Sequence, residues 1–472
     1  MAMGIESSSM EEGAEVLPAR PVPPRQPPGL LTTLIKPQLL SNLVASYPAY
    51  WYEVRRCEFR VGVSRSGRGL LVNDPEAVRR ILVTDAESFP KEENQLAILK
   101  PLLGKGLLTA EGEGWKQNRR LAAPIFQHSS VRDFAPLFVR AAERSALRAI
   151  ERQSIYRIDQ EMTKVTLEII GEAVLSANLD ENIDDISHTV TTILEKFPAM
   201  FLASAYLPAG LRNRFIGSIV QPGRKKLDVF ARAIIEEARK DQDGKTLMHR
   251  LMAASRNEAG QEMSLDQVRD EVATFLLAGH ETTATTLSWA WYLLTLYPEW
   301  QDRLYEEVRG VTGGQRLTAD DVPSLPLTRA VIDETLRLYP VVANLLRRAA
   351  ETVEIAPDIK VPKGDTVLIS PWVLHRHRRY WREPERFDPM RFLGEEAAER
   401  PRQLYMPFGG GPRICIGMSF AIMEAVLILG TYVQRARIKV LNTDKVMPQA
   451  RIVLRPNMPL EAIVSPRNID AH

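Results

Sequence analysis

The segment MPFGGGPRICIGMSF, residues 406–420, concentrates the residue types most suited to chemistry. It contains Cys415, one of two cysteines in the 472-residue chain. A free thiol has a pKa near 8.5, so only a small fraction is thiolate at neutral pH unless its surroundings favour the anion. The glycines at 409–411 form a turn that exposes backbone amides, and the helical pattern after Gly417 places a helix N-terminus near the sulfur. These features favour a thiolate, whereas most lone cysteines are small buried hydrophobes.

The surroundings of Cys415 restrict which metal it could bind. Zinc is disfavoured because the sequence has no CxxC pair and no clustered second ligand. A haem iron needs only one axial protein ligand, and a thiolate is one of the few that proteins use. A thiol hydrolase that uses Cys415 as its nucleophile remains an alternative at this point.

A second unusual segment is AGHETT, residues 278–283, inside a helix that we predict over residues 264–296. Ser264 and Gln267 have capping-box spacing at the start of that helix. Glycine within a helix costs about 1 kcal/mol relative to alanine, and threonine can bond back to a carbonyl four residues earlier. The segment is therefore either a packing notch or a functional groove.

Two further segments place charges at helical spacing. In ETLR, Glu334 and Arg337 are three residues apart and share a helix face. In WKQNRR, Trp115 and Arg119 share one face, and Lys116 and Arg120 a neighbouring one. Taken alone, each pattern is also typical of a solvated surface.

The segment FGGGPRICIG, residues 408–417, resembles the cysteine-ligand loop of the cytochrome P450 superfamily, of the soluble bacterial type. The resemblance implies that Cys415 is the proximal ligand of a haem b iron. It also implies that Phe408 packs beside the sulfur, that Arg413 pairs with a haem propionate, and that Gly417 lets the next helix approach the porphyrin.

The other segments match family motifs in the expected order. By resemblance, Glu281 and Thr282 are the acid–alcohol pair that delivers protons during dioxygen activation, while Ala278 and Gly279 leave room for oxygen. His280 between them is interpreted as a packing residue. The segment PERF at 384–387 implies that Arg386 joins Glu334 and Arg337 in a buried structural triad.

The resemblance also implies haem and substrate contacts. Trp115 and Arg119 match the motif that contacts a propionate, and Arg347 is favoured over Arg348 by one residue as a third contact. By family analogy the pocket is lined by the loop from about 91 to 108 and by Thr274, Leu277 and Val453. The aliphatic composition of that loop indicates a lipophilic substrate, although its leucines could equally be ordinary packing residues.

Composition and patterning set the fold class. The net charge of +2 argues against a general nucleic-acid binder, and no stretch is long and apolar enough to span a membrane. The pattern is mostly helical between about 115 and 345, with short strands before and after it. We expect a mainly α (α+β) class, the helix-rich triangular prism with small sheets of the P450 fold. Residues 1–28 are expected to be an acidic and proline-rich tail, and 29–472 a single domain.

Together these features predict a cytoplasmic haem–thiolate monooxygenase that inserts one atom of O2 into a lipophilic small molecule. No fused flavin or iron–sulfur domain is visible, so a separate ferredoxin-type donor should supply electrons, with Lys116 and Arg120 as a candidate docking surface. A peroxide-using or isomerising haem enzyme is the alternative, disfavoured because Glu281 and Thr282 are both retained. A non-haem helical binding scaffold is the third possibility.

Overall fold

Helices form most of the part of the chain that can be described. The computed structural model describes residues 47–60, 68–152, 154–175, 207–240, 246–260, 262–450 and 452–467, together with a few isolated positions between 44 and 203. Its α-helices are α2 (Pro75–Arg79), α3 (Glu93–Leu103), α4 (Gly112–Ala122), α5 (His128–Arg132), α6 (Ala135–Glu151), α7 (Ile158–Leu175), α10 (Ala209–Lys240), α11 (Leu247–Ala259), α12 (Leu265–Leu296), α13 (Glu299–Thr312), α14 (Pro326–Leu338), α15 (Pro371–Leu374), α16 (Glu395–Glu399) and α17 (Met418–Arg435).

The strands that the structure describes form four small sheets. The largest has the order β1-β2-β7-β4, in which β2 and β7 are parallel and the other neighbours antiparallel. The others have the orders β3-β11-β8, β10-β9 and β5-β6. The strand bounds are β1 (Arg56–Arg60), β2 (Arg68–Val72), β3 (Tyr156–Arg157), β4 (Leu345–Arg348), β5 (Val353–Ala356), β6 (Ile359–Val361), β7 (Thr366–Ile369), β8 (Ala436–Val440), β9 (Pro448–Ala450), β10 (Leu454–Pro456) and β11 (Glu461–Pro466).

Helix α12 is the central element. Its N-terminus is a complete capping box: the Gln267 amide donates to Ser264 Oγ at 3.3 Å, and the Ser264 amide donates to Gln267 Oε1 at 2.9 Å. Both bonds satisfy amides that the first helical turn would otherwise leave unpaired. The predicted start and end of this helix are therefore confirmed. It packs against α7, α10, α14 and α17, and most of its side chains are buried.

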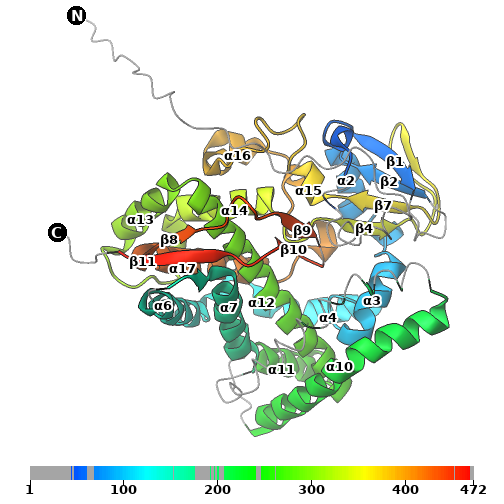
Figure 1. Cartoon of the computed structure of the whole chain (residues 1–472). Coiled ribbons are helices and arrows are strands. Elements are labelled where there is room, and N and C mark those ends of the chain that lie inside the picture. The colour runs from blue at the N-terminus through cyan, green and yellow to red at the C-terminus, as the bar shows by residue number, and fades with distance from the viewer. Residues whose placement is uncertain are drawn as a thin grey trace, which may run out of the picture.

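The four-stranded sheet lies to one side of the helical body (Figure 1). The largest apolar core lies among the helices, and two smaller ones lie against the sheet. Among the residues that the structure describes, no helix is long and apolar enough to cross a membrane. The expected helix-dominated class with small sheets, including a sheet near the N-terminus, is confirmed. The predicted tail at residues 1–28 lies outside the described residues, and the single domain at 29–472 stays a prediction.

Candidate active site

The loop before α17 has a backbone that its glycines make possible. Gly409 and Gly411 have φ values of +74° and +67°, which L side chains rarely adopt. A Cβ added at Gly411 would lie 1.7 Å from the carbonyl oxygen of Leu82, so no other residue fits there. The Cys415 amide donates to the Phe408 carbonyl at 2.9 Å and closes the loop. Cys415 is thus held in a fixed backbone geometry.

The Cys415 side chain reaches solvent, although many protein atoms lie near the sulfur and partly desolvate it. Burial, the largest effect, raises the pKa of the thiol, while the Gly417 amide and the Arg119 charge lower it. The net direction is upward, although the Gly417 amide acts in the direction expected for the loop, and the thiolate state of Cys415 stays a prediction. A coordinated metal ion would supply a positive charge that favours the anion. Within the described ranges, no cluster of three or more metal-ligating side chains occurs.

Helix α12 carries an exposed notch in its middle. Ala278 is exposed, and Gly279 and Thr282 are half-buried, while the other residues of α12 from Val268 to Leu294 are buried. The Thr282 hydroxyl donates to the Ala278 carbonyl at 2.7 Å, the back-bonding predicted from the sequence. The packing of α12 against α7 also favours glycine at position 279, because a Cβ there would lie 2.7 Å from Ile170. The expected role of Gly279 in leaving room for oxygen stays a prediction.

Glu281 is buried and forms an ion pair with Arg455 of β10. Its Oε2 has no hydrogen-bond partner within the described part of the chain. Its carboxylate is therefore held towards β10, whereas the Thr282 hydroxyl is bonded to the helix backbone. Arg455 was not predicted, because it lies 174 residues from Glu281 and follows no recognisable local motif.

His280 is a packing residue in the structure, as interpreted from the sequence. The ring is buried, and its Nδ1 lies 2.6 Å from the Leu276 carbonyl. Burial lowers the pKa of His280. The neutral ring therefore donates from Nδ1 to that carbonyl, one turn earlier on the same helix.

Four basic side chains, which we call the cationic cluster, converge near the cysteine loop: Lys91, Arg119, Arg347 and Arg413. Burial, together with the charges of Arg413 and Arg347, lowers the pKa of Lys91 to about 7. Burial and Arg413 likewise lower the pKa of Arg347, to about 10. Glu111 pairs with Arg413 at 2.9 Å and offsets one of these charges. The cluster therefore has a positive excess that suits a dianionic ligand.

The side chains of the cationic cluster bind neighbouring backbone. Arg413 donates to the Ala110 carbonyl at 2.8 Å, and its guanidinium lies 3.9 Å from the centre of the Trp115 ring. Arg119 donates to the Ile414 carbonyl at 2.6 Å, directly before Cys415. Lys91, which sequence reasoning missed, reaches the Leu108 carbonyl. No local motif marks it, since its position depends on the pairing of Lys91 with Arg347 across a β-bridge.

Arg347 and Arg348 point to different surroundings. Arg347 is buried in the cationic cluster. Arg348 pairs with Glu93 at 3.1 Å, and that glutamate is largely exposed. Arg347 is therefore the one of the two that lies in the cationic cluster, and its role as a propionate contact stays a prediction.

The three predicted pocket residues are all buried. The Thr274 hydroxyl donates to the Asp270 carbonyl at 2.7 Å and lies against Gly106, so it touches the loop that was expected to border the pocket. Leu277 and Val453 belong to the main apolar core. Their role as substrate contacts stays a prediction.

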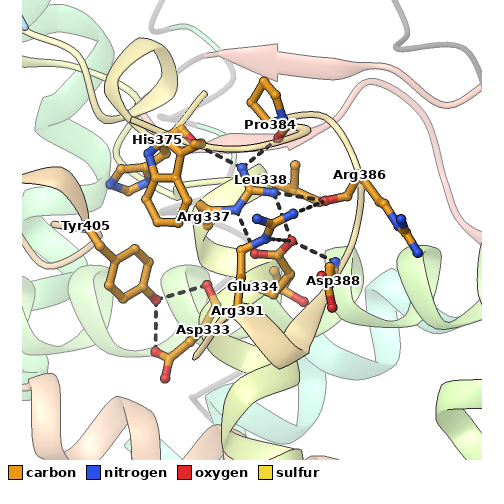
Figure 2. A network of polar contacts seen from close by, with 12 residues as sticks. Asp333, Glu334, Arg337, Leu338, His375, Pro384, Arg386, Asp388, Arg391 and Tyr405 are labelled. Atoms are coloured by element: carbon orange, nitrogen blue, oxygen red, sulfur yellow. Dashed lines mark hydrogen bonds and ion pairs between the residues drawn. The ribbon is translucent and has the colours of Figure 1, made fainter. Parts of the chain in front are cut away.

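The structural triad contains a different arginine from the one predicted (Figure 2). Glu334 and Arg337 are fully buried and 2.6 Å apart, as expected for a paired i,i+3 couple. The third member is Arg391, whose Nε lies 3.1 Å from Glu334 Oε1. Arg386 instead directs its side chain outward to Glu383, and its backbone carbonyl accepts from Arg337 and Arg391.

The assignment of Arg386 to the triad is therefore wrong, for a reason that lies in the local backbone. The turn at Glu383, which has φ of +44°, leads into a stretch where the Arg386 side chain is exposed. The 3₁₀ helix Pro389–Phe392, capped by Asp388, then brings Arg391 inward. Both arginines lie in one short segment, and the sequence does not indicate which one turns inside.

Lys116 and Arg120, the candidate docking residues, are both exposed, but neighbouring carboxylates offset the charge of Lys116. Lys116 lies 3.0 Å from Glu113 and 3.1 Å from Glu87, so two carboxylates offset its charge. Arg120 is exposed on the same helix.

A family model described as Cytochrome P450 matches residues 65–464 of the chain. The chain belongs to the cytochrome P450 family. This P450 is 33% identical to cyclooctatin synthase of Streptomyces melanosporofaciens over 83% of this chain and 85% of the relative. It is 30% identical to cyclooctat-9-en-7-ol 5-monooxygenase of the same organism, over 91% of this chain and 94% of the relative. It is also 29% identical to the human ultra-long-chain fatty acid omega-hydroxylase, over 82% and 77% respectively.

The solved structures agree on the fold. The crystal structure of the haem domain of cytochrome P450DA superposes with a TM-score of 0.76 at 24% identity, over 88% of this P450 and 90% of that chain. The protein is thus a P450 monooxygenase with a haem–thiolate cofactor. As in the family, O2, a lipophilic substrate and electron-transfer partners take part.

Proposed function

We propose that this P450 uses haem b to insert one oxygen atom of O2 into a lipophilic small molecule, with electrons from a separate ferredoxin and its reductase. One observation carries the proposal: the Cys415 thiol is solvent-exposed on a rigid loop that protein atoms surround. A cysteine retained only for packing would be covered. The cationic cluster beside it supplies the charge that two propionate groups need.

The residues present fit a haem–thiolate group. Cys415 would ligate the iron, and Arg119, Arg347, Arg413 and Lys91 would neutralise the propionates. When bound, the haem supplies the oxidising chemistry, since a thiolate ligand favours O–O bond cleavage. The polypeptide provides position, protons and exclusion of water.

The proton-handling residues would act from α12. Thr282 presents its hydroxyl at the exposed notch and can exchange its bond to the Ala278 carbonyl for one to a bound molecule. Glu281 is held by Arg455, and its buried Oε2, which has no hydrogen-bond partner among the described residues, can accept a proton or a water molecule. A carboxylate and an adjacent hydroxyl can then pass solvent protons to the notch.

We propose a hydrocarbon-rich substrate. The names of the relatives describe a cyclooctat-9-en-7-ol 5-monooxygenase and an ultra-long-chain fatty acid hydroxylase, whose substrates are lipophilic. Displacement of water from the haem by a candidate substrate changes the iron spin state, so absorption spectra recorded against a panel of such compounds would identify the class.

The experiment that tests the cofactor assignment uses the two cysteines. Cys415→Ser should abolish the red-shifted, thiolate-type Soret band that appears when the dithionite-reduced protein is exposed to carbon monoxide. Cys57→Ser, on β1, is the matched control and should retain the band at wild-type intensity. A Cys415→Ser protein that keeps the band would contradict the proposal.

A further inference from the structure

The loop at residues 104–111, which we call the latch loop, is pressed against α12 one turn before the active-site notch. A Cβ at Gly104 would lie 2.0 Å from Asp270 Oδ2, and one at Gly106 would lie 2.3 Å from Thr274 Oγ1. Gly104 also has φ of +54°, which favours glycine. The contact between loop and helix is therefore as close as a backbone allows.

Two adjacent acids of α12 hold this loop. The Lys105 amide donates to Asp270 Oδ2 at 2.8 Å, and the Leu107 amide donates to Glu271 Oε2 at 3.2 Å. Asn118 of α4 donates its side-chain amide both to Glu271 Oε1 at 2.9 Å and to the Lys105 carbonyl at 3.2 Å. Glu271 thus joins the loop, α4 and α12.

The far end of the latch loop belongs to the active site. The Leu108 carbonyl accepts from Lys91, the Ala110 carbonyl accepts from Arg413, and Glu111 pairs with Arg413. Both basic residues are members of the cationic cluster. Movement of the latch loop would therefore displace the backbone groups that Lys91 and Arg413 bind.

The two acids differ in how their charge is balanced. Asp270 lies 2.8 Å from the Arg269 guanidinium. Glu271 is only 4% exposed, and within the described residues no cation pairs with it. Burial raises the pKa of Glu271 to about 7, the neighbouring Asp270 adds to this effect, and the Leu107 amide opposes it. An open loop would hydrate the Glu271 carboxyl and return its pKa towards its ordinary value of about 4.3.

Other ionisable groups on the packed elements do not act on Glu271. Arg269 binds Asp228, Asp266 and Asp270. The Lys105 side chain is exposed, and Arg119 of α4 is bonded to the Ile414 carbonyl. None of the other ionisable side chains on the packed elements contributes to the pKa shift of Glu271. They include Lys100 on α3, Arg224 and Asp228 on α10, His249 on α11, and Lys164, Glu168 and Glu172 on α7.

We propose that Asp270 and Glu271 form a proton-dependent latch that closes the 104–111 loop beside the active site and loosens it as the pH rises towards neutrality. Closing buries the Glu271 carboxyl and takes up a proton, and opening releases that proton to solvent. Between about pH 4.5 and 7 the opening equilibrium should rise with pH by up to tenfold per unit and then level off. The latch rests on the proposed function in one respect only: the molecule that would enter past the open loop is taken to be the substrate.

Hydrogen exchange of the holoenzyme, read by mass spectrometry on a peptide that contains Lys105 and Leu107, tests the latch. After correction for intrinsic exchange, wild-type protection should fall by about twentyfold between pH 5.5 and 7.5. Glu271→Gln cannot ionise, so its protection should stay constant over this range and exceed that of the wild type at pH 7.5. Glu424→Gln is the matched control, because it removes another buried glutamate, on α17, and should follow the wild-type curve.

Three outcomes would overturn the latch. If the protection of the wild-type loop from hydrogen exchange does not depend on pH, a proton does not control the latch. This outcome is measured on the wild type alone and does not depend on whether a variant folds. A Glu271→Gln curve that parallels the wild type, or that lies below it at every pH, would assign Glu271 a purely structural role. The carbon monoxide band does not enter this measurement, so failure of the latch and failure of the haem–thiolate assignment are distinguishable.

Discussion

The corrected triad predicts that Arg391 and Arg386, which are five residues apart, contribute very differently to the free energy of unfolding. Arg391 is 8% exposed and contacts Glu334, which is fully buried, whereas Arg386 and its partner Glu383 are 57% and 56% exposed. Arg391 also donates to the Arg382 carbonyl at 3.2 Å. Arg391→Ala would remove these contacts and leave the Glu334 carboxylate with the Arg337 pair and one backbone amide, that of Asp388.

The magnitudes follow from burial. Removing one member of a buried ion pair costs about 3 to 5 kcal/mol. Because Arg337 still pairs with Glu334, we expect Arg391→Ala to lie near the lower end, at about 3 kcal/mol. An exposed pair contributes about 0 to 1 kcal/mol, so Arg386→Ala should cost less than about 1 kcal/mol.

Urea unfolding of the holoproteins, followed by far-ultraviolet circular dichroism, measures both changes in the free energy of unfolding. Arg391→Lys serves as a further control, since it keeps the charge but loses the planar guanidinium, and it should fall between wild type and Arg391→Ala. Equal losses for Arg386→Ala and Arg391→Ala, or a larger loss for Arg386→Ala, would refute the reasoning. That result would return the triad to the arginine predicted from the sequence.

Two further predictions concern proton transfer and acid stability. Thr282→Ala should keep the carbon monoxide band but lower product formation by roughly 10²-fold, while O2 is still consumed and is released as hydrogen peroxide. Thr283→Ala changes the buried neighbour and should leave the ratio of product formed to O2 consumed unchanged. An unchanged ratio in Thr282→Ala would exclude the proton-relay role. Burial and the nearby arginines lower the pKa of His375 to about 3, below its value of about 6.5 in the unfolded chain. The unfolded chain therefore binds a proton at higher pH than the folded protein does, so the free energy of unfolding falls as the pH drops from 6.5 towards 3. At pH 5 the expected loss is about 2 kcal/mol. His375→Gln should show a smaller difference between its unfolding free energies at pH 7 and pH 5 than the wild type, and an equal difference would assign the acid sensitivity to other groups.

The sequence determined the features that depend on neighbouring residues. Three such features are the capping box of α12, the glycine turn at 409–411 and the back-bonding of Thr282, and each depends on residues only a few positions apart. Local sterics and local hydrogen bonds set these features, so a pattern in the chain was enough to find them.

Only the tertiary structure decided which side chains meet across long separations. Arg455 pairs with Glu281, Lys91 joins the cationic cluster, and Arg391 displaces Arg386 from the triad. Each depends on which way a side chain turns once strands and helices have packed, and desolvation then decides which charges need a partner. The direction of the pKa shift of Cys415 has the same origin, because the loop amide and the Arg119 charge lower the pKa while the protein atoms around the thiol raise it.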